Sequence, residues 1–285
     1  DRYSILLKGN EIAKGELMAN YYLAMNPNDT DEKIDGITTR EPTYGLPALW
    51  IKEEVKESAL AKGFTVVDLA TVLTTHLSEI IKQHSHELLG RQDVQQLLDT
   101  VKETHPKVVE ELIPNLLPLG GVVQVLQNLL REQVPIRDLL TILETLADWS
   151  PGTKDLDILA EHVRHALART ITKMHLTPEG QIAAITLGHS LESTISGALQ
   201  QTDHGSFLSL DPSVAQQMMN NLAASLEKMS SLNYQPVVMC SAQIRYHVKR
   251  LIERFMPHIV VLSYDEIMSK VEIQSLEMLE LNNAD

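Results

Sequence analysis

The 285-residue chain has a single cysteine, no excess of basic residues and no long hydrophobic run. Its one cysteine, Cys240, excludes an internal disulfide and fits a reducing compartment. The formal net charge of −14 disfavours nucleic-acid binding and adsorption to anionic lipid, because both depend on clustered lysine and arginine. No apolar run approaches the ~20 residues that span a bilayer. The chain also begins without methionine or signal peptide, inside an expected strand, so we interpret it as a fragment.

Motifs for catalysis and for cofactor or metal binding are missing. There is no glycine-rich phosphate loop, no GxSxG elbow, and no CxxC or HExxH pattern. Gly120-Gly121 is an isolated pair between apolar helices and indicates a turn. His84 and His86 lie two residues apart on an expected helix and cannot converge on one ion, while His76 lies two turns away from His84. The sequence predicts no enzymatic activity, no cofactor and no metal site.

Cys240 is the one candidate for a catalytic group. It ends an expected strand and precedes Ser241, which we expect to open a helix, and such a turn can activate a thiolate. The alternative is a buried small apolar residue beside an N-cap serine. Because no nucleophile signature surrounds it, we favour the core position and keep a Cys240-centred enzyme as the alternative.

What is present is the composition of a protein with a sizeable core: 44% hydrophobic and 22% charged residues. The length predicts two or more subdomains. We expect a mixed α/β fold in which small α/β units precede a central helical subdomain and a C-terminal α/β subdomain. Expected strands are 3–7, 19–25, 48–51 and 64–67, with an exposed loop at 29–41; expected helices are 52–62, one capped by Asp68, 93–104 and 107–113.

The central stretch, residues 88–149, gives the clearest helical pattern. Val122, Val125, Leu126, Leu129 and Leu130 recur on one helix face. A second helix is expected to begin at Pro135, since proline is favoured at the first helical position. A further helix, 156–171, follows. The last third alternates expected strands (181–187, 236–240, 259–263, 271–275) with helices (191–200, 213–228, 242–255), an order that favours a parallel or mixed sheet.

Three segments also carry a resemblance: ATVLTTHL (70–77), GRQDVQQLLD (90–99) and VLQNLLREQVPIRDLLTILETLAD (125–148). They resemble the cytoplasmic half of the FlhA export-gate proteins, the FHIPEP family of flagellar type III secretion, whose relatives serve virulence injectisomes. The resemblance runs from about residue 6 to about residue 259 and is tightest over residues 63–148. It implies four subdomains: 1–19 with 69–88, an insertion at 20–68, a helical unit at 89–168 and a C-terminal unit at 169–285.

The resemblance further implies a non-enzymatic platform that docks export chaperone–substrate complexes and passes substrates to a membrane channel. Its implied partners are those complexes, the export switch protein, the soluble ATPase complex and other copies of itself in a nonameric ring. A membrane portion would precede this domain, which would face the cytoplasm at the bacterial inner membrane. The alternative is a purely structural ring component of a virulence-type secretion gate.

One surface fits such a docking role. Tyr44 lies on a turn between Pro42 and Pro47, and Val67 ends a strand before the next helix. From the residues alone, ordinary subdomain packing explains this pattern better than a partner-binding dimple. The resemblance favours the dimple, although the family pattern Asp-Pro-x-Phe-Gly reads Glu-Pro-Thr-Tyr-Gly here. The lining it implies is Pro27, Glu41, Tyr44, Val67, Val72 and Thr75.

A basic cluster lies on the expected helix 242–255. Its members are Arg245, Lys249, Arg250 and Arg254. The simpler interpretation is a solvated helix face. The other is a contact with an acidic neighbouring subunit, for which a second copy of this acidic chain would be suited.

Overall fold

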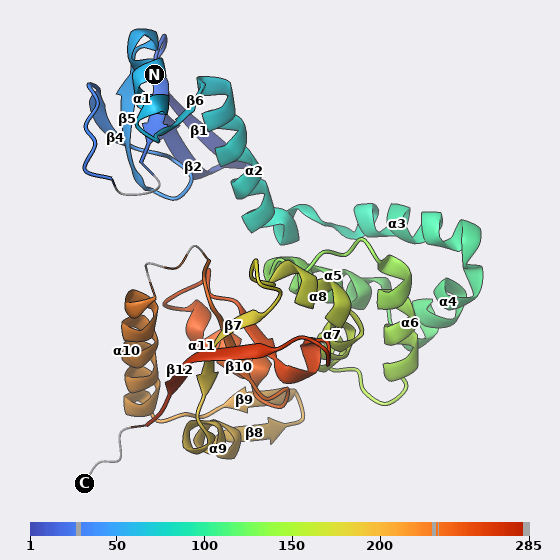
Figure 1. Cartoon of the computed structure of the whole chain (residues 1–285). Coiled ribbons are helices and arrows are strands. Elements are labelled where there is room, and N and C mark those ends of the chain that lie inside the picture. Colours follow the sequence, from blue (N-terminus) through green and yellow to red (C-terminus); the bar gives the residue numbers. More distant parts are fainter. Residues whose placement is uncertain (27–29, 230–231, 233, 282–285) are drawn as a thin grey trace. The chain divides into compact units, whose positions relative to one another are not determined.

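A computed structural model describes residues 1–26, 30–229, 232 and 234–281 (Figure 1). The chain divides into two compact units, Asp1–Leu88 and Leu89–Asp285. Both units combine helices with sheets, which confirms the mixed α/β fold. The finer division into four subdomains stays a prediction.

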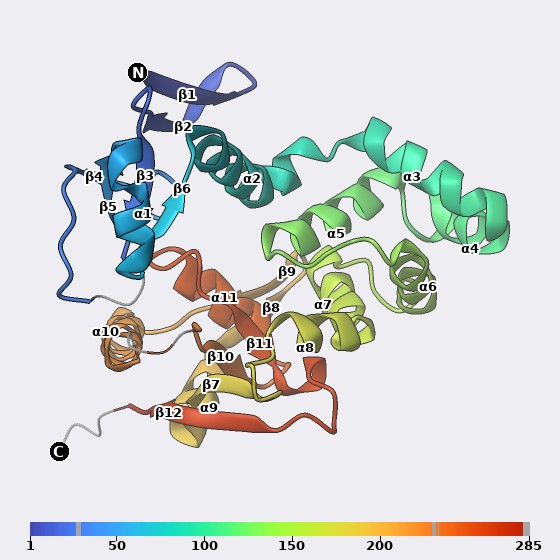
Figure 2. The same ribbon diagram turned by 45° about the horizontal axis from the view of Figure 1, so that its top comes forward.

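The first unit contains a four-stranded antiparallel sheet and a separate hairpin. The sheet has the order β4-β5-β3-β6, and the hairpin is formed by β1 and β2. Two helices, α1 and α2, complete the unit (Figure 2). The bounds are β1 (Arg2–Leu7), β2 (Asn10–Glu16), β3 (Tyr22–Met25), β4 (Ile37–Arg40), β5 (Pro47–Ile51), α1 (Glu53–Ala61), β6 (Thr65–Val67) and α2 (Leu69–Leu88).

Side-chain alternation along β3 gives this sheet two buried faces. Leu23 joins Ala48, Trp50 and Val72 of α2 in one cluster. Its neighbour Ala24 contributes to a second cluster with Ile51, with Ala59 of α1 and with Phe64. Because successive strand residues point to opposite faces, α2 covers one face of the sheet and α1 covers the other.

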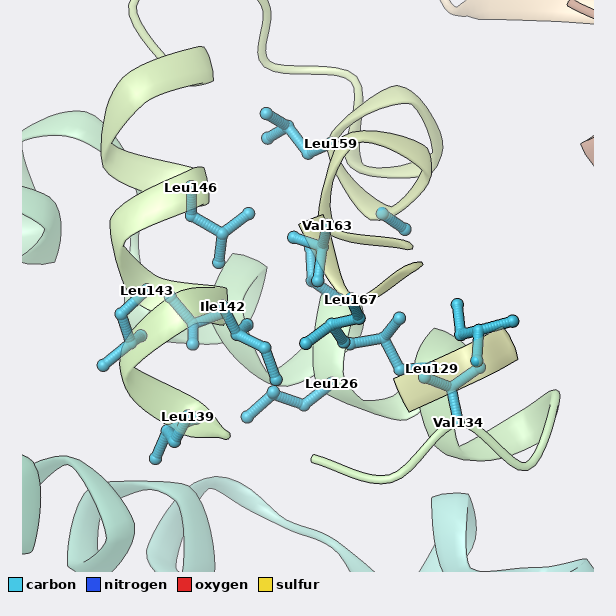
Figure 3. Close-up of a cluster of buried hydrophobic side chains, with 14 of the residues drawn as sticks. Leu126, Leu129, Val134, Leu139, Ile142, Leu143, Leu146, Leu159, Val163 and Leu167 are labelled. Atoms are coloured by element: carbon cyan, nitrogen blue, oxygen red, sulfur yellow. The ribbon is translucent and has the colours of Figure 1, made fainter. Parts of the chain in front are cut away.

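The second unit begins with a helical part. Its buried side chains are aliphatic and come from facing sides of neighbouring helices, as Figure 3 shows for α5, α6 and α7. A π-helical segment, Leu112–Leu116, connects α4 to α5. The helices are α3 (Arg91–Thr104), α4 (Pro106–Glu111), α5 (Leu119–Arg131), α6 (Leu139–Trp149), α7 (Leu156–Ala166) and α8 (Ala168–Met174).

A parallel sheet of order β11-β10-β7-β12 follows in the same unit. Ile182 and Ala184 of β7 belong to the core of the helical part, whereas Ile185 and Leu187 join a second core. Both faces are therefore buried, as is usual for parallel sheets. The bounds are β7 (Ile182–Leu187), α9 (His189–Gly197), β8 (Leu199–Thr202), β9 (Gly205–Leu208), α10 (Pro212–Lys228), β10 (Val237–Cys240), α11 (Arg245–Glu253), β11 (Val261–Ser263) and β12 (Ile273–Leu279).

Several expected elements are wrong in detail. The expected loop 29–41 contains β4, because Thr38 and Thr39 pair with β5. The expected helix 191–200 ends at Gly197, and a β8–β9 hairpin follows, whose turn uses Gly205 at φ +117°. The second strand of the first hairpin, β2, was not expected either. The expected helix 156–171 is divided into α7 and α8 at Leu167.

Among the described residues no single helix has the length and apolarity required to cross a membrane. One bent pair, Pro106–Leu116 with Leu119–Arg131 at 107°, passes that length and composition test only when taken together. The inward residues of this pair, including Leu112, Val122 and Leu126, are fully buried in the protein core.

Candidate functional site

The predicted docking residues that the structure describes all belong to the first unit. Val72 is buried in the core cluster between the sheet and α2, and Val67 packs against that cluster from β6. Thr75 follows on α2 about one helical turn after Val72 and is exposed. Glu41 and Tyr44 lie on the turn between β4 and β5. Pro27 lies outside the described residues. The concave dimple itself stays a prediction.

The turn from Glu41 to Leu46 is organised by the carboxylate of Glu41. This side chain is only 6% exposed and accepts backbone N–H groups of Thr43 (2.8 Å), Tyr44 and Leu46 (3.2 Å). The Glu41 amide also donates to the Leu46 carbonyl (2.9 Å). Gly45 adopts φ +70°, a conformation that favours glycine. Glu41, which the resemblance assigned to the lining of the dimple, is thus a buried residue that holds its own turn.

The turn presents Tyr44 to solvent. Its side chain is 67% exposed, and the carboxylate of Glu79 on α2 faces its hydroxyl. Partial burial, followed by the negative charges of Glu79 and Glu41, raises the pKa of Tyr44. Glu79 follows Thr75 by one helical turn, so both residues lie on the same side of α2. Because Glu79 faces Tyr44, that is also the side of α2 on which the aromatic ring lies.

A buried histidine, His76, connects α2 to β1. His76 is 3% exposed, and the Tyr3 hydroxyl of β1 lies 2.7 Å from its Nδ1, with the two rings in an edge-to-face arrangement. Burial lowers the pKa of His76, and the charge of Glu41 opposes that shift. Helical spacing within α2 could not predict the hydrogen bond between His76 and Tyr3, because Tyr3 lies on a distant strand.

The basic cluster of α11 does not form a solvated face. Arg245 has no exposed surface and Lys249 has 7%. The ammonium of Lys249 donates to the carbonyls of Pro257 (3.2 Å) and Ile259 (2.7 Å) within the same unit. Neither side chain is available to a neighbouring subunit, which corrects that part of the prediction. Arg250 is partly exposed and Arg254 is exposed, so a subunit contact through them stays a prediction.

Arg245 instead belongs to a buried ion-pair network that joins the helical part to the sheet. Its guanidinium donates to Glu161 (Nε, 2.8 Å) and to Glu132 (Nη1, 3.0 Å). Arg164 donates to both oxygens of Glu266 (2.7 and 3.0 Å) and to Glu132 (3.2 Å). Burial opposes ionisation of Glu132, but Arg245 and then Arg164 outweigh it and lower its pKa to about 2. Sequence reasoning missed this network, since its members are far apart along the chain.

Part of this network has the composition of a metal site. Ligand atoms of Glu161, His165 and Glu266 all lie within 4.8 Å of one another. However, Arg245 already bonds to Glu161, and Arg164 bonds to Glu266. A divalent cation would have to displace two buried guanidinium groups, so this arrangement favours an ion-pair network over metal binding.

Cys240 is completely buried in the second core of the sheet. Burial raises the pKa of its thiol well above the usual range, which works against thiolate formation at neutral pH. Ser241 does not cap a helix, because α11 begins only at Arg245. These observations favour the core interpretation of Cys240.

The second unit also contains a polar cleft of about 780 Å³. It lies between α5, the start of α7 and the β8–β9 turn. The lining consists of Gln124, Gln127, Asn128, Arg131, Lys154, Asp155, Leu156, Asp157, Asp203, His204 and Gly205. The lining carries both basic and acidic side chains, so its chemistry selects no particular ligand.

Comparison with known proteins gives consistent matches along the chain. The FHIPEP family matches residues 1–272. The flagellar biosynthesis protein FlhA of Bacillus subtilis (strain 168) is 44% identical over 281 residues, which cover 99% of this chain and 42% of that protein. The chain thus spans less than half of this curated relative's length.

Several solved structures have the same fold as this chain. CdsV of Chlamydia pneumoniae has a TM-score of 0.88 and 29% identity, covering 98% of this chain and 80% of that one. CdsV in its complex with CdsO has a TM-score of 0.84 and 28% identity over the same shares. The nonameric SctV-C of EPEC has a TM-score of 0.79 and 26% identity, covering 98% and 83%.

Proposed function

This chain belongs to the FHIPEP family, and we propose that it is the cytoplasmic docking platform of a flagellar-type protein export gate. It binds export chaperones loaded with their substrates and passes the substrates to the membrane channel. The observation that carries this proposal is the Tyr44 turn. A buried carboxylate holds the turn that presents a 67%-exposed aromatic ring, and Glu79 of α2 faces the hydroxyl of that ring.

An aromatic ring that is exposed on a preorganised turn suits partner binding and contributes little to folding. While Tyr44 is exposed it contributes little to the stability of the free domain, but a partner that buries the ring gains stability from it. Tyrosine is enriched among the residues that dominate interface energies. Leu46, in the same turn, is 53% exposed and extends the apolar surface. A partner that covers both residues removes apolar area from water without rearranging the turn.

The solved relatives support one part of the proposed assembly, since SctV-C is nonameric and CdsV forms a complex with CdsO. We propose a ring of copies of this domain. The contacts that we also propose, with the soluble ATPase complex and the export switch protein, are those that the family resemblance implies. A membrane-embedded portion of the same polypeptide would hold the ring at the cytoplasmic face of the inner membrane. The domain itself would catalyse no reaction.

Titration calorimetry of this domain with a purified flagellar chaperone–substrate complex tests the proposal. Tyr44→Asp and Thr75→Met should each weaken binding at least about tenfold, the equivalent of about 1.4 kcal/mol. Thr74→Met is the matched control, because Thr74 is exposed on the same helix but points about 100° away from Thr75. Circular dichroism should be unchanged in all three variants.

Each outcome separates the alternatives. Undiminished binding by both Tyr44→Asp and Thr75→Met places the docking site elsewhere. A wild-type domain that binds no chaperone–substrate complex overturns the docking platform and favours the purely structural ring component. A reaction of Cys240 with thiol probes in the folded protein, together with loss of an activity in Cys240→Ala, would favour the enzyme.

A further inference from the structure

We propose that Glu41 is a positioning residue for partner binding: its carboxylate fixes the turn that presents Tyr44 and does not itself contact the partner. This inference rests on the proposed docking function. It assigns the binding contact to the exposed aromatic ring and the preorganisation of that ring to the buried acid.

The hydrogen bonds of the carboxylate point inward. One oxygen accepts the amide of Thr43 at 2.8 Å, and the other accepts the amides of Tyr44 and Leu46, the latter at 3.2 Å. With 6% of its surface exposed, Glu41 offers a partner almost no accessible oxygen. A carboxylate that is already bonded to three N–H groups is a fixed element of the binding surface, not a free ligand.

The surrounding contacts close the same turn from other directions. The guanidinium of Arg40 donates to the Gly45 carbonyl at 2.7 Å, and the Gly45 amide donates to the Glu41 carbonyl at 3.1 Å. These bonds span the residues on both sides of Tyr44. The ring therefore projects from a backbone whose conformation is already fixed by hydrogen bonds. A partner does not have to order that backbone on binding.

The geometry distinguishes two substitutions. Glu41→Gln replaces one acceptor oxygen by an NH₂ group, which cannot accept from backbone amides and removes the charge that strengthens the remaining bonds. Glu41→Asp keeps the charge on a shorter arm. Aspartate commonly accepts amides two and three residues ahead, which here are those of Thr43 and Tyr44. We expect Asp to retain most of the function and Gln to lose it.

Hydrogen exchange in the free domain tests the turn without any partner. In Glu41→Gln, the amides of Thr43, Tyr44 and Leu46 should exchange at least about tenfold faster than in wild type. In Glu41→Asp, the first two should stay within about threefold of wild type. Exchange should be unchanged at Val94 and Leu98, which are core positions of the second unit. Unchanged exchange of the three turn amides in Glu41→Gln overturns the proposal.

A double-mutant cycle with the chaperone–substrate complex tests the second half of the inference. Glu41→Gln should weaken binding about tenfold when Tyr44 is present and by less than about twofold in a Tyr44→Ala background. Full additivity would show that Glu41 contacts the partner independently of the ring, and would overturn the positioning role. A wild-type domain that binds no complex overturns the proposed function, whereas the exchange measurement still decides whether Glu41 holds the turn.

Discussion

Arg245 shows how a single charged residue can be structural in an acidic protein. It is fully buried and donates to Glu132, to Glu161 and to the Val261 carbonyl (3.0 Å). Replacement by methionine would keep most of the apolar stem but leave two carboxylates without their buried partner. Loss of one member of a buried ion pair costs about 3–5 kcal/mol. We therefore expect Arg245→Met to lower the free energy of unfolding by that amount in urea denaturation.

Arg254→Met is the control for that variant, because Arg254 lies one residue beyond the end of α11 and is exposed. Exposed charges usually change stability by no more than about 0.5 kcal/mol. An Arg245→Met protein as stable as Arg254→Met would mean that the network does not hold the helical part to the sheet.

The loss of folding stability at low pH should depend on Glu132. Its folded-state pKa of about 2 lies below the ordinary value of 4.5. The ionised carboxylate therefore stabilises the native state above pH 4.5, and this contribution is lost as the pH falls through the interval toward 2. The urea midpoint of the wild-type protein should fall sharply between about pH 6 and about pH 3, and that of Glu132→Gln should fall much less.

Glu253→Gln serves as the comparison for pH dependence, since Glu253 is partly exposed and pairs with Arg250 on the protein surface. It should retain the wild-type fall in the urea midpoint. If Glu132→Gln lost stability between the two pH values as steeply as wild type, other carboxylates would have to account for acid unfolding.

At the scale of elements, α6 begins at Leu139 and not at Pro135. Val134 is buried just after Gln133, which adopts φ +63°, and the chain stays non-helical until Asp138. The carboxylate of Asp138 accepts the amide (3.2 Å) and the hydroxyl (2.7 Å) of Thr141. Pro135 correctly indicated that a helix begins nearby, but the N-cap Asp138 sets its first residue at Leu139.

This start can be tested by thermal and urea denaturation of two alanine variants. Asp138→Ala should destabilise the protein by about 1 kcal/mol, the usual effect of a lost N-cap. Pro135→Ala should change stability by less than about 0.5 kcal/mol, because Pro135 precedes the cap and lies outside the helix. The reverse order of the two effects would place the helix start at Pro135.

Amphipathic helices and buried parallel strands were predictable because their signal is local. Val122, Val125, Leu126 and Leu129 recur at helical spacing and are all buried. The β8–β9 hairpin was not predictable in the same way, since each strand is only four residues long and β8 is mostly polar. Its formation depends on a turn that brings Thr202 and Gly205 together, with the Thr202 hydroxyl donating to the Gly205 carbonyl (2.7 Å).

The candidate site was predictable only in part, for a related reason. The exposed ring of Tyr44 and the buried Val72 follow from a proline-flanked turn and from helical spacing. The burial of Glu41 does not, because its partners are backbone amides that any sequence possesses. Arg245 was misinterpreted on the same grounds: helical spacing showed a charged cluster, whereas the carboxylates that bury it come from α7 and from the end of α5.

At the scale of the whole molecule, each unit has cores built from its own residues. The two clusters of the first unit draw on residues 17–72, and those of the second unit on residues 89–281. The buried ion-pair network also lies entirely within the second unit. A unit with its own core is expected to fold without the rest of the chain.

A fragment that spans residues 89–285 should therefore unfold cooperatively, with the same near-ultraviolet signature and nearly the same urea midpoint that this unit has in the whole chain. Arg245→Met should lower that midpoint equally in the fragment and in the whole chain, whereas Tyr44→Asp in the whole chain should leave it unchanged, because distant sites add independently. A fragment without a cooperative transition would show that the second unit depends on the first, and stability effects could then no longer be assigned to one unit at a time.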